Sequence, residues 1–162
     1  MADALTATAQ RVQDALKALG VASQVVELPA STRSAAEAAQ AIGCRVEQIA
    51  KSLVFRGLST DRPILAIVSG ANRVDEELLG ELIAEPVAKA DADYVRQRTG
   101  YAIGGVPPVG HLESLVCLID EDLFQHDTIW TAAGTPRAVF RLMPVDLKRI
   151  TGGRVVSFKQ AR

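Results

Sequence analysis

The sequence has few of the side chains on which metal sites and disulfide frameworks depend. Only two cysteines and two histidines occur among its 162 residues. Cys44 and Cys117 lie far apart, and neither His111 nor His126 belongs to an H-E-x-x-H or Cys-x-x-Cys set. We therefore expect two reduced, partly buried thiols, no metal and no cofactor.

Long apolar runs are also missing. No stretch approaches the ~20 apolar residues that a membrane-spanning helix requires. The first residues include the acidic Asp3 and lack the apolar centre of a secretory signal. These absences disfavour secretion and membrane insertion, so we expect a cytoplasmic protein without a membrane partner.

A large excess of charge is missing as well. The formal net charge is −1, whereas general nucleic-acid binding needs a concentrated basic face, so no DNA partner is expected. The charges are unevenly spread, because residues 137–162 are rich in lysine and arginine while acids gather over 61–93. This asymmetry could present a modest basic surface to RNA, or it could be an ordinary solvated surface.

Three familiar catalytic motifs are absent. The chain has no G-x-S-x-G nucleophile elbow, no G-x-x-x-x-G-K-[ST] phosphate loop and no G-x-G-x-x-G after a strand. A serine hydrolase with that elbow, a P-loop nucleotidase and a Rossmann dehydrogenase therefore lose support. Cys44 follows a predicted helix end with no identifiable cationic partner, which disfavours a thiolate nucleophile.

The apolar pattern predicts a single domain over residues 1–162, with an α/β fold in which helices pack outside a curved, mixed sheet. Apolar residues make up 48% of the chain, enough for a sizeable core. Helices are predicted at 5–19, 34–43, 75–83, 91–98 and 144–150. Strands are predicted at 23–28, 51–56, 63–69, 115–119, 128–132, 138–142 and 155–158.

Lys51 begins one of these strands. Alternation places it on the same face as the apolar Leu53 and Phe55. A buried ammonium group is costly unless it is paired. Either this strand end opens onto a polar cleft, or the lysine reaches solvent along its aliphatic stem.

The segment GYAIGGVPPVGH at 100–111 is a shaped loop. Its prolines remove two backbone donors, which excludes a helix. Gly104 and Gly105 permit close approach of a ligand, and Pro107 and Pro108 stiffen the end of the loop, so backbone N–H groups could be held ready for a carbonyl or an oxyanion. An ordinary rigid turn is the alternative.

Taken together, three ordered features resemble the YbaK family. They are Lys51 at the head of an apolar strand, the later loop Gly104-x-x-x-Pro108, and Ala133-Gly134 before a strand that leads into LMPVDL at 142–147. The similarity extends over residues 31–158. Family members are aminoacyl-tRNA deacylases related to the editing domain of bacterial prolyl-tRNA synthetase. The resemblance implies a barrel-like mixed sheet surrounded by helices, with a cleft between the lysine and the glycine-rich loop.

The same resemblance implies a function. It predicts a free-standing, metal-independent deacylase that hydrolyses the ester of a mischarged tRNA, chiefly tRNA for proline carrying alanine, cysteine or another small amino acid. Backbone amides at Gly104, Gly105 and Val106 would hold the aminoacyl carbonyl while water attacks. Lys51 would bind a phosphate or hydroxyl of the terminal adenosine. The expected partners are the acceptor end of that tRNA and, as a further candidate, a prolyl-tRNA synthetase.

Substrate contacts are expected from a second set of residues: Pro107, Pro108, Leu53, Ser69, Gly70, His111 and Thr131. The adjacent prolines depart from the family's simplest loop pattern, which leaves the identity of the amino acid open. Each residue could instead belong to the core or a turn, and the histidine could hydrogen-bond locally. Thr32 and Arg33, just before a predicted helix, could line a cleft or form a surface loop.

Two other functions fit the same residues. A non-catalytic module would use the cleft to bind an amino acid, an aminoacyl adenylate or a synthetase without turnover. A hydrolase of small amino esters or amides would show no dependence on tRNA. Hydrolysis of mischarged tRNA that requires Lys51 would favour the editing enzyme over both.

Overall fold

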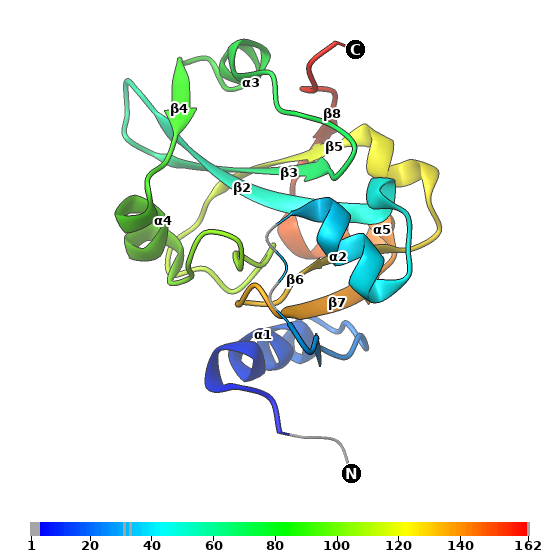
Figure 1. Ribbon diagram of the computed structural model, residues 1–162. Coiled ribbons are helices and arrows are strands. Elements are labelled where there is room, and N and C mark those ends of the chain that lie inside the picture. The colour runs from blue at the N-terminus through cyan, green and yellow to red at the C-terminus, as the bar shows by residue number, and fades with distance from the viewer. Residues whose placement is uncertain (1–3, 31, 33, 162) are drawn as a thin grey trace.

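One mixed sheet organises the part of the chain that the computed structural model describes, residues 4–30, 32 and 34–161. Within these residues the sheet has eight strands in the order β1-β7-β6-β2-β3-β5-β8, with β4 paired to β2 beside this path (Figure 1). The strands are β1 (Val26–Glu27), β2 (Ile49–Gly57), β3 (Pro63–Ser69), β4 (Val87–Lys89), β5 (Val116–Asp120), β6 (Ile129–Ala132), β7 (Ala138–Leu142) and β8 (Arg154–Val156).

Parallel and antiparallel pairs both occur along this order. The pairs β2–β6, β3–β5 and β5–β8 are parallel, whereas β1–β7, β6–β7, β2–β3 and β2–β4 are antiparallel. The predicted hairpin between residues 51–56 and 63–69 is the β2–β3 pair, and the one across Gly134 is the β6–β7 pair. The mixed α/β architecture expected from the sequence is confirmed.

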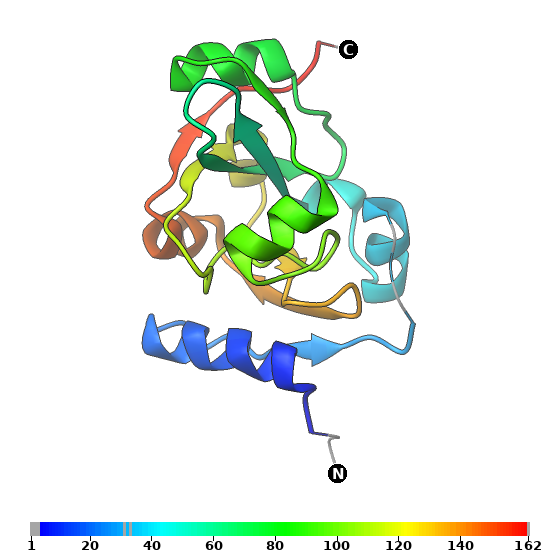
Figure 2. The ribbon, with the colours of Figure 1, turned by 90° about the vertical axis from the view of Figure 1, so that its left-hand side faces the viewer.

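Five α-helices flank the sheet in the described part of the chain (Figures 1 and 2). They are α1 (Ala7–Ala18), α2 (Ala35–Ile42), α3 (Glu76–Ile83), α4 (Ala92–Thr99) and α5 (Pro144–Thr151). The predicted start of α2 is confirmed, because the Ser34 hydroxyl accepts a hydrogen bond from the Glu37 amide at 3.1 Å. None of the described helices is long and apolar enough to cross a lipid bilayer.

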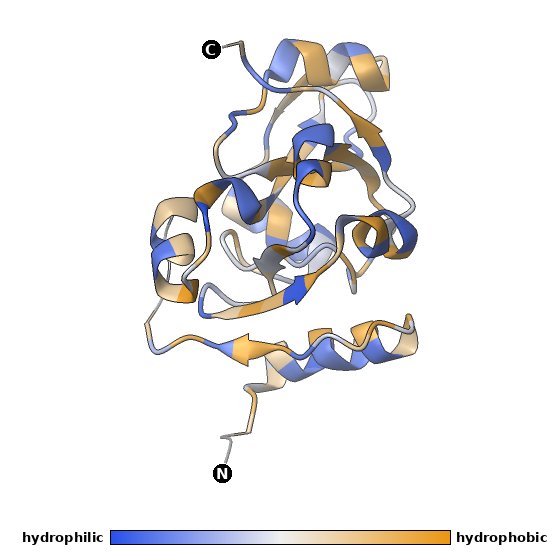
Figure 3. Cartoon of the chain, turned by 90° about the vertical axis from the view of Figure 1, so that its right-hand side faces the viewer, coloured by the Kyte–Doolittle hydropathy of each residue, from blue (hydrophilic) through white to orange (hydrophobic). Residues whose placement is uncertain are grey.

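The sheet has a buried core on each face. Every residue of β3 is buried, as its continuous apolar run predicts. Leu65 and Ile67 join the larger core with α1, while Ile64, Ala66 and Val68 join a second core with α3. Figure 3 shows apolar residues running along the central strands, whereas the helices carry both apolar and polar residues.

On the side away from β3, β2 is only partly paired with other strands. The unpaired stretch leaves a gap in the sheet, and the candidate site lies beside this gap. β2 pairs with β3 from Ala50 to Arg56. On its other side it pairs with β6 only through Ile49 and Ala50, and with β4 only from Phe55 onward. Between these two contacts, residues 51–54 have no partner strand among the described residues.

The glycine-rich loop crosses in front of that gap. Gly100 ends α4 in a left-handed conformation, close to the predicted helix end at residue 98. A Cβ added at Gly105 would lie 2.7 Å from the Cα of Thr135. The Gly134 amide donates to the Gly105 carbonyl at 2.8 Å. Gly105 therefore allows the loop to pack closely on the turn between β6 and β7.

Candidate active site

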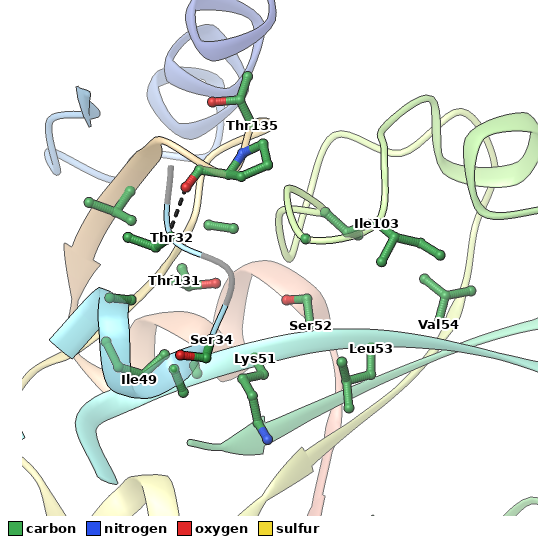
Figure 4. Close-up of a pocket in the computed structure, with 18 of the residues that line it drawn as sticks. Thr32, Ser34, Ile49, Lys51, Ser52, Leu53, Val54, Ile103, Thr131 and Thr135 are labelled. Carbon is green, nitrogen blue, oxygen red and sulfur yellow. Dashed lines mark hydrogen bonds between the residues drawn. The ribbon is translucent and has the colours of Figure 1, made fainter. Parts of the chain in front are cut away.

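A cavity of about 400 Å³ lies beside the unpaired edge of β2. β2 forms one wall, and Ile103, Gly104 and Val106 of the glycine-rich loop form part of another. Figure 4 shows Ile103 of the loop above β2 on one side, and Thr131 of β6 and Thr135 of the following turn on the other. The structure thus brings the glycine-rich loop to the strand that carries Lys51, although the two are far apart in sequence.

Most of the lining is apolar, and a few hydroxyl groups interrupt it. The Oγ of Ser52 and the Oγ1 of Thr131 are buried and have no hydrogen-bond partner among the described residues. Thr131 is only 2% exposed. A third hydroxyl, that of Thr32, is satisfied because it donates to the Pro136 carbonyl at 2.9 Å. Ser52 and Thr131 therefore carry the buried lining hydroxyls that lack a hydrogen-bond partner within the described part of the chain.

Lys51 lines the cavity, but its ammonium group points away from the side that carries the Ser52 hydroxyl (Figure 4). Its Nζ donates to the carbonyl of Asn72 at 3.1 Å. Burial lowers the pKa of Lys51, the positive charges of Arg73 and Lys89 lower it further, and the charge of Asp120 opposes them. The charges that act on Lys51 are thus those of two cations, Arg73 and Lys89, and one carboxylate, Asp120.

A buried carboxylate holds the acceptor of the lysine in place. Asp120 is 1% exposed, and its Oδ2 accepts from the Asn72 side chain at 2.8 Å and from the Ser69 amide at 3.0 Å. These bonds fix the segment that follows β3, including the Asn72 carbonyl that meets Lys51. Asp120 therefore positions Lys51 through Asn72.

The backbone donors of the loop differ in availability. The Gly105 amide donates to the Ala102 carbonyl at 3.0 Å, so it already has a partner. The amides of Gly104 and Val106 have none among the described residues, and both residues line the cavity. Gly104 and Val106 are therefore the cavity-lining residues of this loop whose amides lack a partner within the described part of the chain.

The expected substrate contacts separate into two groups. Leu53 and Thr131 line the cavity. The others do not line it: Pro107, Pro108, Ser69, Gly70 and His111. Gly105, expected to offer a backbone amide, does not line it either.

The residues outside the cavity hold the surrounding backbone. The Nε2 of His111 lies 2.7 Å from the Pro107 carbonyl, and because that oxygen only accepts, the ring nitrogen donates. Burial lowers the pKa of His111, against the opposing effect of this bond. The Ser69 hydroxyl donates to the Glu47 carbonyl at 2.9 Å, and Gly70 permits close packing against Val46.

Several lining residues had no strong sequence signal. Ser52 could have been found from alternation alone, since it lies on the face opposite Lys51. Ile103, Trp130 and Pro136 line the cavity because of long-range packing. Of the two places predicted for Thr32, a cleft or a surface loop, the structure shows the first, because Thr32 lines the cavity. Arg33 lies outside the described residues.

Side chains that could bind a metal are not grouped here. Among the described residues, no group of three or more histidine, cysteine, aspartate or glutamate side chains is placed to hold a metal ion. The polar residues that line the cavity are instead serines, threonines and lysines.

The family described as the aminoacyl-tRNA editing domain matches residues 29–150. The chain belongs to this family. The match spans β2, the glycine-rich loop and β6, and it confirms the resemblance to the YbaK family seen in the sequence. The cavity beside β2 is therefore the cavity of an editing domain.

Individual relatives agree with this membership. The uncharacterized protein YwhH of Bacillus subtilis is 29% identical over 133 residues, which cover 82% of this chain and 84% of that protein. EbsC of Enterococcus faecalis, named as a proposed Cys-tRNA(Pro)/Cys-tRNA(Cys) deacylase, is 26% identical over 75% of this chain and 74% of its own. A crystal structure described as a proposed trans-editing enzyme for prolyl-tRNA synthetase is 48% identical, with a TM-score of 0.92 over 98% of this chain and 100% of that one.

Proposed function

We propose that this editing-domain protein is a deacylase that acts in trans on tRNA for proline carrying a small amino acid. One observation carries the proposal: Gly104 and Val106, whose backbone amides have no partner among the described residues, line the same cavity as Lys51. The descriptions of EbsC and of the 48% identical structure, which both refer to proline or its tRNA, support the choice of tRNA.

The reaction needs positioning more than acid–base chemistry, because an aminoacyl ester is already activated. The Gly104 and Val106 amides donate to the ester carbonyl oxygen as it gains negative charge. A water molecule attacks the carbonyl carbon and gives up a proton, which the vicinal 2′-hydroxyl transfers to the departing 3′-oxygen. The products are the free amino acid and uncharged tRNA.

Lys51 binds the phosphate end of the substrate in this proposal. An ammonium group has three donors, and the Asn72 carbonyl uses one of them. Arg73 and Lys89 repel its positive charge, so a phosphodiester placed among the three cations would relieve the repulsion. The terminal nucleotide would then be anchored at one end while its aminoacyl group enters the cavity.

The test is release of radiolabelled amino acid from tRNA for proline charged separately with alanine, cysteine, serine and proline. We expect hydrolysis of at least one mischarged species, with the proline ester spared and activity lost in Lys51→Ala. Lys148→Ala, which removes an exposed lysine of α5, is the matched control. Near-normal deacylation by Lys51→Ala would overturn the proposed role of the lysine.

Failure on every ester would point elsewhere. If the folded protein releases no amino acid from any charged tRNA, the deacylase proposal fails and a binding module replaces it. Hydrolysis of free amino-acid esters that added tRNA does not inhibit would instead indicate a small-molecule hydrolase.

A further inference from the structure

Two unsatisfied hydroxyls share one face of the sheet inside the cavity. Thr131 of β6 pairs with Ala50 of β2 in parallel register. Ser52 is two residues beyond Ala50, so alternation places its side chain on the same face. Figure 4 shows the Ser52 and Thr131 side chains on the cavity side of their strands. Neither hydroxyl has a partner within the described part of the chain.

Buried polar groups in proteins are nearly always hydrogen-bonded, and one that is not destabilises the structure unless a ligand pairs with it. Here the two side-chain exceptions found among the described residues occur together, in a cavity otherwise lined mostly by apolar side chains such as Val54, Ile103 and Val106. The ligand that suits this arrangement is mostly apolar and carries one small hydrogen-bonding group.

We propose that Ser52 and Thr131 form a subsite for the side-chain hydroxyl of the aminoacyl group, so that the preferred substrates are tRNAs charged with serine or threonine. This rests on the proposed deacylase function. A hydroxyl both donates and accepts, so it matches the hydrogen-bonding capacity of either protein hydroxyl. A thiol makes weaker bonds, and the methyl group of alanine makes none.

The α-ammonium group of the substrate suits this subsite less well. No aspartate or glutamate is among the described residues that line the cavity, and the charged residues there are Lys51 and Lys89. The charges of these lysines repel the α-ammonium group. Hydrogen bonds to two neutral hydroxyls also do not offset the free-energy cost of removing that charged group from water. The subsite therefore selects a neutral polar group.

The expected discrimination is large, because a site built to hydrogen-bond a substrate hydroxyl rejects analogues that lack it far more strongly than an apolar pocket does. We expect kcat/KM for the seryl or threonyl ester of tRNA for proline to exceed that of the alanyl ester by at least about 10-fold. Equal kcat/KM values for the seryl, threonyl and alanyl esters would overturn the proposal.

Two variants test the subsite itself. Ser52→Ala and the nearly isosteric Thr131→Val should each reduce the ratio of seryl to alanyl turnover by at least about 10-fold. Both should keep or raise Tm, because each removes an unsatisfied buried hydroxyl. Ser59→Ala, at an exposed serine, should leave the ratio unchanged. A ratio unchanged in both cavity variants would refute the subsite.

A binding measurement separates this inference from the proposed function. Adenosine carrying a seryl or an alanyl group through a 3′-amide resists hydrolysis, and its Kd can be measured by calorimetry. If no ester is hydrolysed but the seryl amide binds at least about 10-fold more tightly than the alanyl amide, the deacylase proposal fails and the subsite stands. Equal Kd values would refute the subsite whether or not the esters are hydrolysed.

Discussion

The carbonyl oxygen of Asn72 lies 3.1 Å from the ammonium nitrogen of Lys51. This contact joins the segment after β3 to the strand that lines the cavity. Because Asp120 holds Asn72 from the buried side at 2.8 Å, the position of the lysine depends on a carboxylate that does not line the cavity. Both the charge of Lys51 and its support can be tested.

The first prediction concerns pH. Burial and the charges of Arg73 and Lys89 lower the pKa of Lys51, so the ammonium form that binds phosphate is lost at a lower pH than for an exposed lysine. KM for mischarged tRNA should therefore rise with pH below the usual lysine range. Arg73→Gln removes one repelling charge, so it should move this rise to higher pH.

Lys51→Arg provides the control, since its guanidinium stays charged across the same range. The measurement is kcat and KM from about pH 7 to about pH 10, all below the usual lysine pKa of about 10.4, corrected for spontaneous ester hydrolysis. The same pH profile in the wild type and in Lys51→Arg would contradict the assignment of this change to Lys51.

The second prediction concerns Asp120. Its Oδ2 accepts from both Ser69 and Asn72, and its Oδ1 accepts from the Asp122 amide at 2.9 Å. In Asp120→Asn, one carboxylate oxygen becomes an NH2 group. Because both oxygens accept from N–H donors in the wild type, this NH2 group would face another donor. We expect Asp120→Asn to lower the free energy of unfolding by about 1–3 kcal/mol, measured with urea.

Deacylation should also fall in this variant, through a higher KM, because the support of Lys51 is disturbed. Asp127→Asn, at an exposed aspartate, should change neither quantity. Full activity together with the expected loss of stability would show that Asp120 does not position Lys51.

The third prediction concerns the loop. A Cβ at Gly105 would lie 2.7 Å from the Thr135 Cα and 2.8 Å from the Gly134 carbonyl oxygen. Gly105→Ala must therefore push the loop off the β6–β7 turn and move the Gly104 and Val106 amides. We expect kcat to fall at least about 10-fold, since misplaced oxyanion donors cost that much or more.

Gly20→Ala separates this clash from ordinary backbone strain. Gly20 has a φ of +76°, and no described atom lies within 4 Å of an added Cβ, so alanine there costs stability without moving the loop. Deacylation assays and thermal melts of both variants make the comparison. If Gly105→Ala keeps the wild-type kcat, the packing of the loop does not set the geometry of the amides.

Local signals predicted the elements well. The helix start at Ser34, the helix end at Gly43 and the buried strand at 63–69 each depend on a few neighbouring residues, and each is confirmed. The lateral arrangement of strands was not predictable, because parallel pairing brings Thr131 beside Ala50 without any nearby sequence cue. For the same reason the gap along β2, which creates the cavity, could not be foreseen.

The sequence also could not predict which backbone N–H groups of the glycine-rich loop lack a hydrogen-bond partner. Glycines at 104 and 105 look equivalent in the chain, but the turn from Ala102 uses the Gly105 amide and leaves the Gly104 amide without a partner among the described residues. Ser69 ends its strand as expected, yet its hydroxyl bonds to Glu47 rather than facing the cavity. These outcomes depend on contacts made only after folding.

The fourth prediction concerns the cysteines. Burial raises the pKa of Cys117 to about 11 and raises that of Cys44, so both are protonated at neutral pH. Near pH 8, Cys117 should react with iodoacetamide about 100-fold more slowly than a free thiol, in line with its thiolate fraction. The variant with both cysteines replaced by alanine should still deacylate tRNA; loss of kcat in a folded variant would point to a thiolate mechanism.

The last prediction concerns stability in acid. Glu85 is 7% exposed; burial raises its pKa, but hydrogen bonds from Thr60, Ser59 and Arg62 outweigh burial and lower it overall. A carboxylate with a lowered pKa stabilises the fold above the unfolded-state value of about 4.3, and this stabilisation disappears as pH falls through the folded-state pKa.

Tm should therefore fall on acidification from about pH 5 to about pH 2 in the wild type and fall less steeply in Glu85→Gln. The variant should be less stable than the wild type at neutral pH, because the amide cannot replace the charged acceptor of Arg62. Glu121→Gln, at an exposed glutamate, should follow the wild-type curve. If Glu85→Gln shows the wild-type slope, other carboxylates control acid unfolding, and the Glu85 cluster only shapes the turn between β2 and β3.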